Sequence, residues 1–524
     1  MRLSRRALLG RGAAGAGVLG LGALPRAAAA AQPDGSSGPN TVLVVLPLVR
    51  QDHVDAFEGG SPAKTPNLNE LTGDSLRFDR TVPESMPGLP ARRALITGMR
   101  SYPFRDWKRT EGLAPIPGFN PIWDHQPVLT ETLRLHDIET VYVSDNPILT
   151  GPRWPDVVRP PGAVDSAPAE PGIDSDLLAA IKRQTVAARR TFRTGVRELE
   201  RLGEGSKRFF LAIDPFDPAE AANAPPVYVK PREVEDEGLG PMNDRLVELN
   251  WSGEDEQRVR DAYKRHVEAV DDEVGRLMDK LRELDLLGDT LLVAIGDQGI
   301  ALGDHDFLGI ATPTSHRPAY EVPFLIRHPE GDMGGDDVDW YAASHDVAPT
   351  ILSFMGITIP GKMGGEDLMA LFDDVDDEDL YDRPFNITAV GSNIIVQDKR
   401  WLMVADREEI ERRMYDDDEE VEDDITRFEN IANEDTGKLT ELSLVALVVA
   451  GGTLPEFGPD GALRPKVERG DDDTDSDGIP NDFDPVDNDE PDDGTEPEDL
   501  EFDGRIPEGG ELPTNERTPE PRAP

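Results

Sequence analysis

Short, uninterrupted hydrophobic runs recur along the chain between residues 40 and 330. The first is Val-Leu-Val-Val-Leu at 42–46, which ends at Pro47. A continuous apolar run without polar alternation is typical of a strand buried on both faces of a parallel sheet. Runs of the same kind follow at 140–143, 209–213, 290–295 and 324–326. These runs predict a large central sheet whose strands are mostly parallel.

Helical patterns lie between the predicted strands. The clearest has apolar residues three and four positions apart, at Val267, Val270, Val274, Leu277, Leu281 and Leu284. Gly288 is expected to end this helix, because glycine is common just after a helix and the next strand begins almost at once. Alternating strands and helices favour an α/β fold, here a three-layer sandwich with helices on both faces of the sheet.

The pattern changes after residue 385, which we take as the end of an α/β domain that begins at residue 40. Short strands are predicted at 387–390, 394–397 and 401–404, and a helix at 439–449. They predict a small C-terminal subdomain of antiparallel sheet and helix over 386–458. Residues 459–524 are rich in proline, glycine and acidic residues, so they cannot bury a core and are predicted to be a disordered acidic tail.

The N-terminus has the order of a twin-arginine signal peptide, predicted over residues 1–31. Arg5 and Arg6 precede a mildly apolar segment, and a run of alanines from 27 to 31 supplies small residues for cleavage. A short membrane anchor is the alternative, but the apolar run is shorter than the roughly 20 residues that a spanning helix needs. We expect export to the periplasm, cell surface or medium, with no transmembrane segment in the mature protein.

The net charge and the absence of cysteine limit which kinds of partner and which covalent links the protein can have. The formal net charge of the 524-residue chain is -50, which disfavours nucleic acid and anionic membranes because both would repel such a surface. Much of the acid lies in the last quarter of the chain, so the total says less about the folded domain. The chain contains no cysteine, which excludes disulfides and a lipid-modified cysteine.

Seven segments, in the family's order, resemble the sulfatase family of the alkaline-phosphatase-like superfamily, and the resemblance covers roughly residues 40 to 450. "LPARRALITG" (89–98) is similar to the end of the family signature C/S-x-P-S/A-R and the Leu-Thr-Gly that follows it. The other six are TPNLNELTGDSLRFDR (65–80), RFFLAIDPFDPAEA (208–221), LLVAIGDQGIALGDHDFLG (291–309), VPFLIRHPEG (322–331), SHDVAPTILSFMGITIP (344–360) and MYDDDEEVEDDITRFENIAN (414–433).

The resemblance implies hydrolysis of sulfuric esters of small molecules or glycans by a formylglycine made from cysteine or serine. Gly88 occupies the position of that residue, and glycine has no heteroatom to attack sulfur. Ser85 and Thr81 lie nearby, but a displacement of three or more residues would move the attacking oxygen by several ångströms. Gly88 is therefore a degenerate nucleophile position.

The family also uses a divalent cation, usually calcium, which two aspartates after the first strand help to bind. Alignment places Pro47 and Leu48 at these positions, and neither has a side-chain oxygen. Asp297 is retained at a strand end, and the neighbouring Gln298 has a carbonyl that can coordinate weakly. Because calcium takes six or more oxygens, loss of two carboxylates is expected to remove most of the affinity.

Of the other family positions, some are replaced in this sequence and others are retained. A lysine and a histidine of the family correspond to Ile310 and Ala219, whereas Arg92 matches the signature arginine. Arg92 has two interpretations, as a charge partner for an anionic group at position 88 or as a structural contact from helix to loop. His305 also matches a family position, but a lone histidine near a loop is more often a hydrogen-bonded structural group.

The acidic tail carries a separate pattern in DDDTDSDGIPNDFD (471–484). Alternate oxygen ligands can wrap one Ca²⁺, glycine at loop position six permits a sharp turn, and the carbonyl at position seven adds a ligand. The proposed ligands are Asp473, Asp475, Asp477, Ile479 and Asp484. The segment is similar to the calcium repeats of thrombospondin type 3, and a solvated acidic linker is the alternative.

Three hypotheses follow. The chain is an exported, sulfatase-like pseudoenzyme or very weak hydrolase whose pocket still binds an anionic ester or glycan. Alternatively, it is an active sulfate or phosphate ester hydrolase that uses a displaced nucleophile or a metal-bound water. In a third hypothesis, the α/β domain is a scaffold for a calcium-dependent surface or matrix component.

Overall fold

The computed structural model describes eleven stretches of the chain. They are residues 38–57, 61–161, 173–223, 227–229, 252–304, 307–310, 317–329, 337–372, 383–405, 413–416 and 435–457. The predicted signal peptide and the acidic tail lie outside these stretches. Within them, no helix is long and apolar enough to cross a membrane.

An eight-stranded sheet forms the centre of the molecule, with strand order β11-β2-β10-β7-β1-β5-β3-β4. Strand β10 runs antiparallel to both neighbours, and every other pairing in this sheet is parallel. The strands are β1 (Asn40–Leu46), β2 (Leu76–Val82), β3 (Glu139–Ser144), β4 (Val157–Val158), β5 (Phe209–Asp214), β7 (Thr290–Gly296), β10 (Phe324–Arg327) and β11 (Asp337–Ala343). The predicted, mostly parallel sheet is confirmed.

Strand β1 lies between β7 and β5, with Val42 opposite Leu292 on one side and Leu211 on the other. All seven residues of β1 are buried. Helices cover both faces of the sheet, so a strand in this position needs apolar side chains in both directions. This explains why the sequence shows a continuous hydrophobic run instead of alternation.

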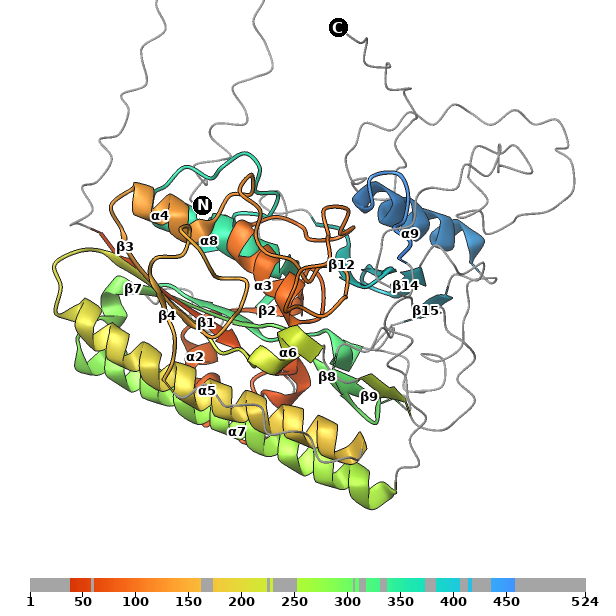
Figure 1. Cartoon of the computed structure of the whole chain (residues 1–524), viewed down its shortest axis with the longest axis horizontal. Helices are drawn as coiled ribbons and strands as arrows, with labels where there is room; N and C mark the ends of the chain where they lie inside the picture. The colour runs from red at the N-terminus through yellow and green to blue at the C-terminus, as the bar shows by residue number, and fades with distance from the viewer. Residues whose placement is uncertain are drawn as a thin grey trace, which may run out of the picture.

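The helices form the two outer layers of the predicted three-layer sandwich (Figure 1). Helices α3 (Gly88–Thr97), α4 (Leu129–Leu135) and α8 (Val347–Phe354) pack together on one face. The long helices α5 (Ile173–Gly203) and α7 (Gly253–Glu283) pack against each other on the opposite face, and α2 (Pro66–Gly73) contacts α7.

Helix α7 contains the predicted apolar positions from Val267 to Leu281 and ends at Glu283. Leu284 lies just beyond it, so the helix ends earlier than Gly288 suggested. Its start has a reciprocal cap. The Ser252 hydroxyl accepts a hydrogen bond from the amide of Asp255 at 3.2 Å, and the Asp255 carboxylate accepts one from the amide of Ser252 at 3.2 Å. Such a capping box satisfies two of the amides that a helix start leaves unpaired.

Two smaller sheets complete the fold. An antiparallel sheet combines β12 (Asn386–Val390), β13 (Asn393–Gln397), β14 (Trp401–Ala405) and β15 (Arg413–Asp416), and α9 (Thr436–Val449) packs on β13 and β14. This is the antiparallel C-terminal subdomain that the sequence predicted. The other sheet joins β6 (Val227–Val229), β9 (Phe307–Ile310) and β8 (Ile300–Leu302).

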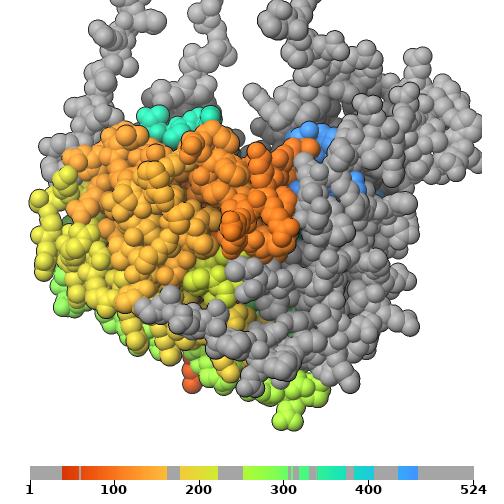
Figure 2. All heavy atoms as spheres, viewed as in Figure 1, coloured from red at the N-terminus to blue at the C-terminus, as the bar shows by residue number. Residues whose placement is uncertain are grey.

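The C-terminal subdomain shares a hydrophobic core with the main domain. Tyr102, Phe104 and Trp107, which follow α3, lie in the same buried cluster as Ile394 and Leu442 of the subdomain. In the space-filling view, the orange and yellow segments that include α4 and α5 form a continuous surface over the sheet (Figure 2). The strands beneath are largely hidden in that view.

Candidate functional site

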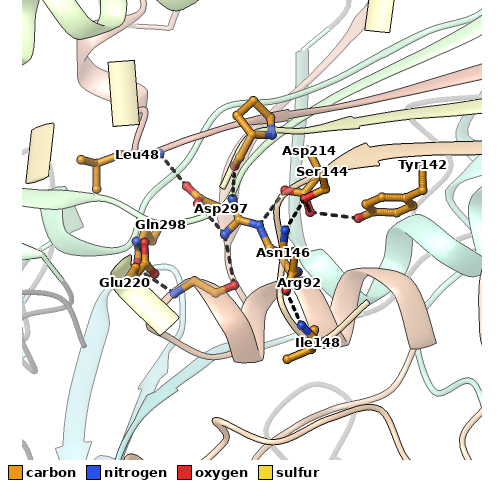
Figure 3. A network of polar contacts seen from close by, with 12 residues as sticks. Leu48, Arg92, Tyr142, Ser144, Asn146, Ile148, Asp214, Glu220, Asp297 and Gln298 are labelled. Carbon is orange, nitrogen blue, oxygen red and sulfur yellow. Dashed lines mark hydrogen bonds and ion pairs between the residues drawn. The ribbon is translucent and has the colours of Figure 1, made fainter. Parts of the chain in front are cut away.

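The candidate site lies where four neighbouring parallel strands end. Strands β7, β1, β5 and β3 are consecutive in the sheet, so their carboxyl ends share one edge. Ligands of open α/β sheets bind at this edge. Short helix α6 (Pro218–Asn223) follows β5, and α3 begins at Gly88, so both helices contribute residues here (Figure 3). The predicted residues Gly88, Arg92, Asp297 and Gln298 all meet at this point.

The guanidinium of Arg92 is the centre of the cluster. Its Nε donates to Oδ1 of Asp214 at 2.6 Å, and its Nη2 donates to the carbonyl of Pro215 at 2.8 Å. Arg92 lies one turn into α3, so its Nη1 also reaches back to the carbonyl of Gly88 at 3.2 Å. The ring of Phe216 lies 4.8 Å from the guanidinium carbon. Arg92 is only 1% exposed.

Asp297 follows β7 and supplies the second carboxylate. Its Oδ2 lies 2.8 Å from Nη1 of Arg92, in an ion pair that is not a directed hydrogen bond. Its Oδ1 accepts the amide hydrogen of Leu48 at 2.6 Å. Burial lowers the pKa of Arg92, but the nearby carboxylates, those of Asp214 and Asp297 foremost, outweigh it and raise the pKa above the ordinary value. Arg92 therefore remains a cation, and its charge is already compensated.

Polar residues of the neighbouring strand hold Asp214 in place. Its Oδ2 accepts hydrogen bonds from the hydroxyls of Tyr142 and Ser144, each at 3.2 Å. The Ser144 hydroxyl in turn accepts the amide hydrogen of Asn146 at 3.0 Å. Figure 3 shows this chain of contacts leading from Arg92 to the end of β3. The orientation of Asp214 is thus fixed from two sides.

The space beside Gly88 is filled. The amide of Gly88 donates to Oε1 of Gln298 at 3.1 Å, and Nε2 of Gln298 lies 3.4 Å from Oε1 of Glu220. A Cβ atom built on Gly88 would overlap Oε1 of Glu220 and would lie 2.8 Å from Nη1 of Arg92. Real Cβ atoms essentially never approach other atoms this closely. A side chain at position 88 requires Glu220 or Arg92 to move.

Glu220 is a buried carboxyl group of α6. Its Oε2 lies 2.9 Å from Nε2 of Gln184, which reaches it from α5. Burial raises the pKa of Glu220 to about 8, although the nearby Arg92 charge opposes the shift. Near neutral pH, Glu220 is therefore mostly protonated, and it adds little negative charge to the cluster.

The metal that the family resemblance implies does not fit these residues. Calcium needs six or more oxygen ligands. The side chains at 47 and 48 offer none, and the Pro47 carbonyl accepts a hydrogen bond from Nε2 of His266 at 2.7 Å. Asp297 is held by Arg92 and by the Leu48 amide. Across the stretches that the structure describes, no three His, Asp or Glu side chains could hold a metal ion.

The remaining predicted residues fall in two groups. His305 and the tail residues Asp473, Asp475, Asp477, Ile479 and Asp484 lie outside the described residues. Ile310 is a buried residue of β9, and Ala219 lies in α6.

Sequence reasoning missed Asp214, Glu220, Tyr142 and Ser144. Asp214 directly follows the predicted strand 209–213 and is the last residue of β5, so it could have been found by its position at the carboxyl edge of the sheet. Ser144 directly follows the predicted strand 140–143 and carried the same signal. Glu220 and Tyr142 had no comparable signal.

Comparisons with known proteins agree with the fold and with the sulfatase resemblance. The model of the Sulfatase family matches residues 39–357, which is more than half of the chain. The chain belongs to the sulfatase family. Curated relatives include an N-acetylglucosamine-6-O-sulfatase of Bacteroides thetaiotaomicron, which is 29% identical over 149 residues. An ulvan-active sulfatase of Formosa agariphila is 31% identical over 137 residues.

The matched stretches are short compared with these sulfatases. They cover 26% of this chain and 26% of the first relative, and 25% of this chain and 27% of the second. The match therefore spans about a quarter of the length of these curated relatives.

Among solved structures, the phosphonate monoester hydrolase of Agrobacterium radiobacter superposes with a TM-score of 0.58 at 18% identity, over 82% of this chain and 100% of that one. A 2-O GAG sulfatase also gives 0.58, at 15% identity, over 78% of this chain and 91% of that one. At these identities, the likeness shows the fold.

Proposed function

We propose that this protein is an exported member of the sulfatase family in which sulfuric ester hydrolysis is lost or nearly lost. The observation that carries the proposal is the filled space beside Gly88. A formylglycine side chain would have to stand where Glu220 and Arg92 already lie. The position therefore lacks a nucleophile, and a side chain there requires the buried end of Glu220 or Arg92 to shift.

The charge arrangement supports the same conclusion. In the family, a cation and basic side chains stabilise the charge that develops on the ester oxygens. Here the charge of Arg92 is engaged by Asp214 and Asp297. An incoming sulfate ester would meet two carboxylates instead of an uncompensated cation. Any anionic ester or glycan would thus be held outside this buried cluster.

A displaced serine nucleophile is disfavoured by its contacts. The Ser85 hydroxyl donates to Oε2 of Glu84 at 2.8 Å, and Ser85 is fully buried. Burial raises the pKa of Glu84, although Arg100 and hydrogen bonds from Ser101 and Ser85 oppose the shift. The two carboxylate oxygens of Glu84 also accept hydrogen bonds from the amides of Ser101 and Tyr102. Ser85 is therefore committed to holding this loop.

The proposal includes export and a tail that binds calcium. The paired arginines at 5 and 6 support export by the twin-arginine route, and the aspartate spacing of 473–484 supports calcium binding. Under this proposal, calcium binds to the tail. The carboxylates of Asp214 and Asp297 at the strand ends are instead neutralised by the guanidinium of Arg92.

Turnover tests the proposal. Purified protein is incubated with aryl sulfate and aryl phosphate esters in the presence of Ca²⁺, Mn²⁺ or Zn²⁺, beside the matched variant Asp297→Asn. We expect the rates of both proteins to equal the rate without protein. Metal-dependent turnover that is present in the natural protein and lost in Asp297→Asn would reject the proposal and favour a metal-activated water.

A further inference from the structure

One stretch of helix α5 is strongly basic in a strongly acidic chain. The whole chain has 104 acidic residues against 54 Lys and Arg. Residues 177–197 nevertheless contain no Asp or Glu. The cations of this stretch are Lys182, Arg183, Arg189, Arg190, Arg193 and Arg197. The overall composition of the chain does not explain this reversal of charge.

Two of these six cations are engaged beside the candidate site. Nε of Arg183 lies 2.7 Å from Oδ2 of Asp217, which follows β5. Arg190 pairs with Asp145, which follows β3. Both contacts tie α5 to the carboxyl edge of the sheet, so these two arginines have a structural role.

The other four cations are exposed. They form the α5 basic stripe, which consists of Lys182, Arg189, Arg193 and Arg197. Their spacing of seven, four and four residues places them on one face of the helix. The stripe extends over about 22 Å, because an α-helix rises 1.5 Å per residue.

The stripe has little compensation from its surroundings. Arg193 lies 3.7 Å from Oε1 of Glu273, and Glu273 also pairs with Arg276 at 2.5 Å. Arg197 donates to the hydroxyl of Thr194 at 3.0 Å. Within the described stretches, no carboxylate forms an ion pair with Lys182, Arg189 or Arg197. Like charges four residues apart destabilise a helix, so a bound anion would relieve this repulsion.

We propose that the α5 basic stripe is a docking surface for residues 471–501 of the same chain. This acidic segment contains 16 Asp and Glu and no Lys or Arg. Opposite charges of this density attract each other strongly at low salt, and the attraction weakens as salt screens it.

The tail can reach the stripe. The described chain ends at residue 457, and residues 458–470 precede the acidic segment. Thirteen extended residues span up to about 45 Å at 3.3 to 3.6 Å per residue, and the acidic segment itself extends the reach. A folded domain of this size has a radius of gyration of about 20 Å. A compact domain with this radius of gyration is about 50 Å across, a distance that the linker and the first residues of the acidic segment span together.

The tail is a better occupant than an external polyanion. A molecule with a net charge of -50 repels free polyanions, which must also lose translational freedom to bind. The tail is tethered, so its effective concentration at the stripe is in the millimolar range for a flexible linker. The sum of these effects favours the intramolecular contact.

Zero-length cross-linking with a carbodiimide tests the proposal on the full chain in calcium-free buffer. The reagent joins an amine to a carboxylate in direct contact, and Lys182 is the only lysine of the stripe. We expect peptides in which Lys182 is linked to a carboxylate of 471–501. The yield should fall at least about tenfold at 1 M salt, where the Debye length is about 3 Å.

Matched variants distinguish an effect of the stripe residues from an effect of the net charge of the protein. Arg189→Gln, Arg193→Gln and Arg197→Gln together should lower the Lys182 cross-link several-fold. The control Arg258→Gln, Arg260→Gln and Lys264→Gln makes the same change in charge at two exposed positions and one half-buried position of α7, and it should leave the yield unchanged. A mixture of isotopically heavy and light protein should give cross-links within one chain only.

Three outcomes would overturn the proposal. Lys182 could be linked only to carboxylates of the folded domain. The yield could be insensitive to salt and to the stripe variant. Heparin at millimolar concentration could bind the full chain through the stripe while the tail cross-link is absent, which would assign the surface to an external polyanion.

Discussion

Nη1 of Arg92 lies 2.8 Å from Oδ2 of Asp297, the acidic residue that the sulfatase resemblance places at the metal site. A side-chain cation thus faces the carboxylate that the family offers to a metal. With Asp214 on its other side, Arg92 forms a buried ion cluster that needs no external cation. The strand ends are held together by the protein's own charges.

Substitution of Gly88 by serine should destabilise the protein without creating activity. The new Cβ would overlap Glu220, and overpacking of this kind costs about 1 to 3 kcal/mol of unfolding free energy. Urea unfolding measures the loss. Gly361→Ser is the matched control, because no atom lies within 4 Å of a Cβ built there. Adding Glu220→Ala to Gly88→Ser should recover part of the stability, and an unchanged midpoint for Gly88→Ser alone would contradict the filled-space interpretation.

Removing the charge of Arg92 should lower the free energy of unfolding substantially. Arg92→Met would leave Asp214 and Asp297 buried without their cation, and breaking a buried pair in this way costs about 3 to 5 kcal/mol. The double variant with Asp297→Asn should lose less than the sum of the two single variants, since the two residues interact. The measurement is a double-mutant cycle from denaturant unfolding. Additive losses would show that the ion pair contributes no coupling energy.

Glu220 should make the protein less stable as the pH rises. Its pKa is raised from 4.5 to about 8, so the folded state keeps a proton that the unfolded state has lost. The unfolding free energy should therefore fall between about pH 4.5 and 8, by up to about 1.4 kcal/mol for each unit of pKa difference.

Thermal melting across this pH range checks the prediction. The slope should be reduced in Glu220→Gln and retained in Glu204→Gln, which changes an exposed position of the same residue type. Equal slopes in the natural protein and Glu220→Gln would show that Glu220 titrates normally.

The acidic tail is expected to bind calcium. Calorimetric titration of the full chain should detect a site that is weakened at least about tenfold by Asp473→Asn and Asp475→Asn, because each change removes a carboxylate ligand. Replacing Asp487 and Asp489 by asparagine makes the same change in charge outside the 473–484 pattern and should have a smaller effect. Equal losses in both variants would indicate diffuse binding to a solvated acidic linker.

The sequence predicts the fold well because buried strands need apolar residues, and these form recognisable hydrophobic runs. The residues of β1 and β5 are apolar on both faces, so their hydrophobic runs mark them as central strands. Helix α5 was not among the helices predicted from the sequence, although it is as long as α7. Its apolar positions are mixed with alanine and threonine, and the contact with α7 defines its buried face.

The site is predictable only in part. Gly88, Arg92, Asp297 and Gln298 were found because they stand in segments that resemble the family. Sequence left the role of Arg92 open, because the choice depends on whether its charge is compensated. Glu220 carries no motif, and it comes beside Gly88 only because α6 folds back over the end of β5. Such contacts belong to the tertiary structure.

A crystal structure of the protein soaked in millimolar Ca²⁺ tests the central claim most directly. We expect the Arg92 guanidinium to lie between Asp214 and Asp297, with no metal ion at the strand ends and with Glu220 beside Gly88. A calcium ion bound to Asp297, with the Arg92 side chain displaced toward solvent, would contradict the claim.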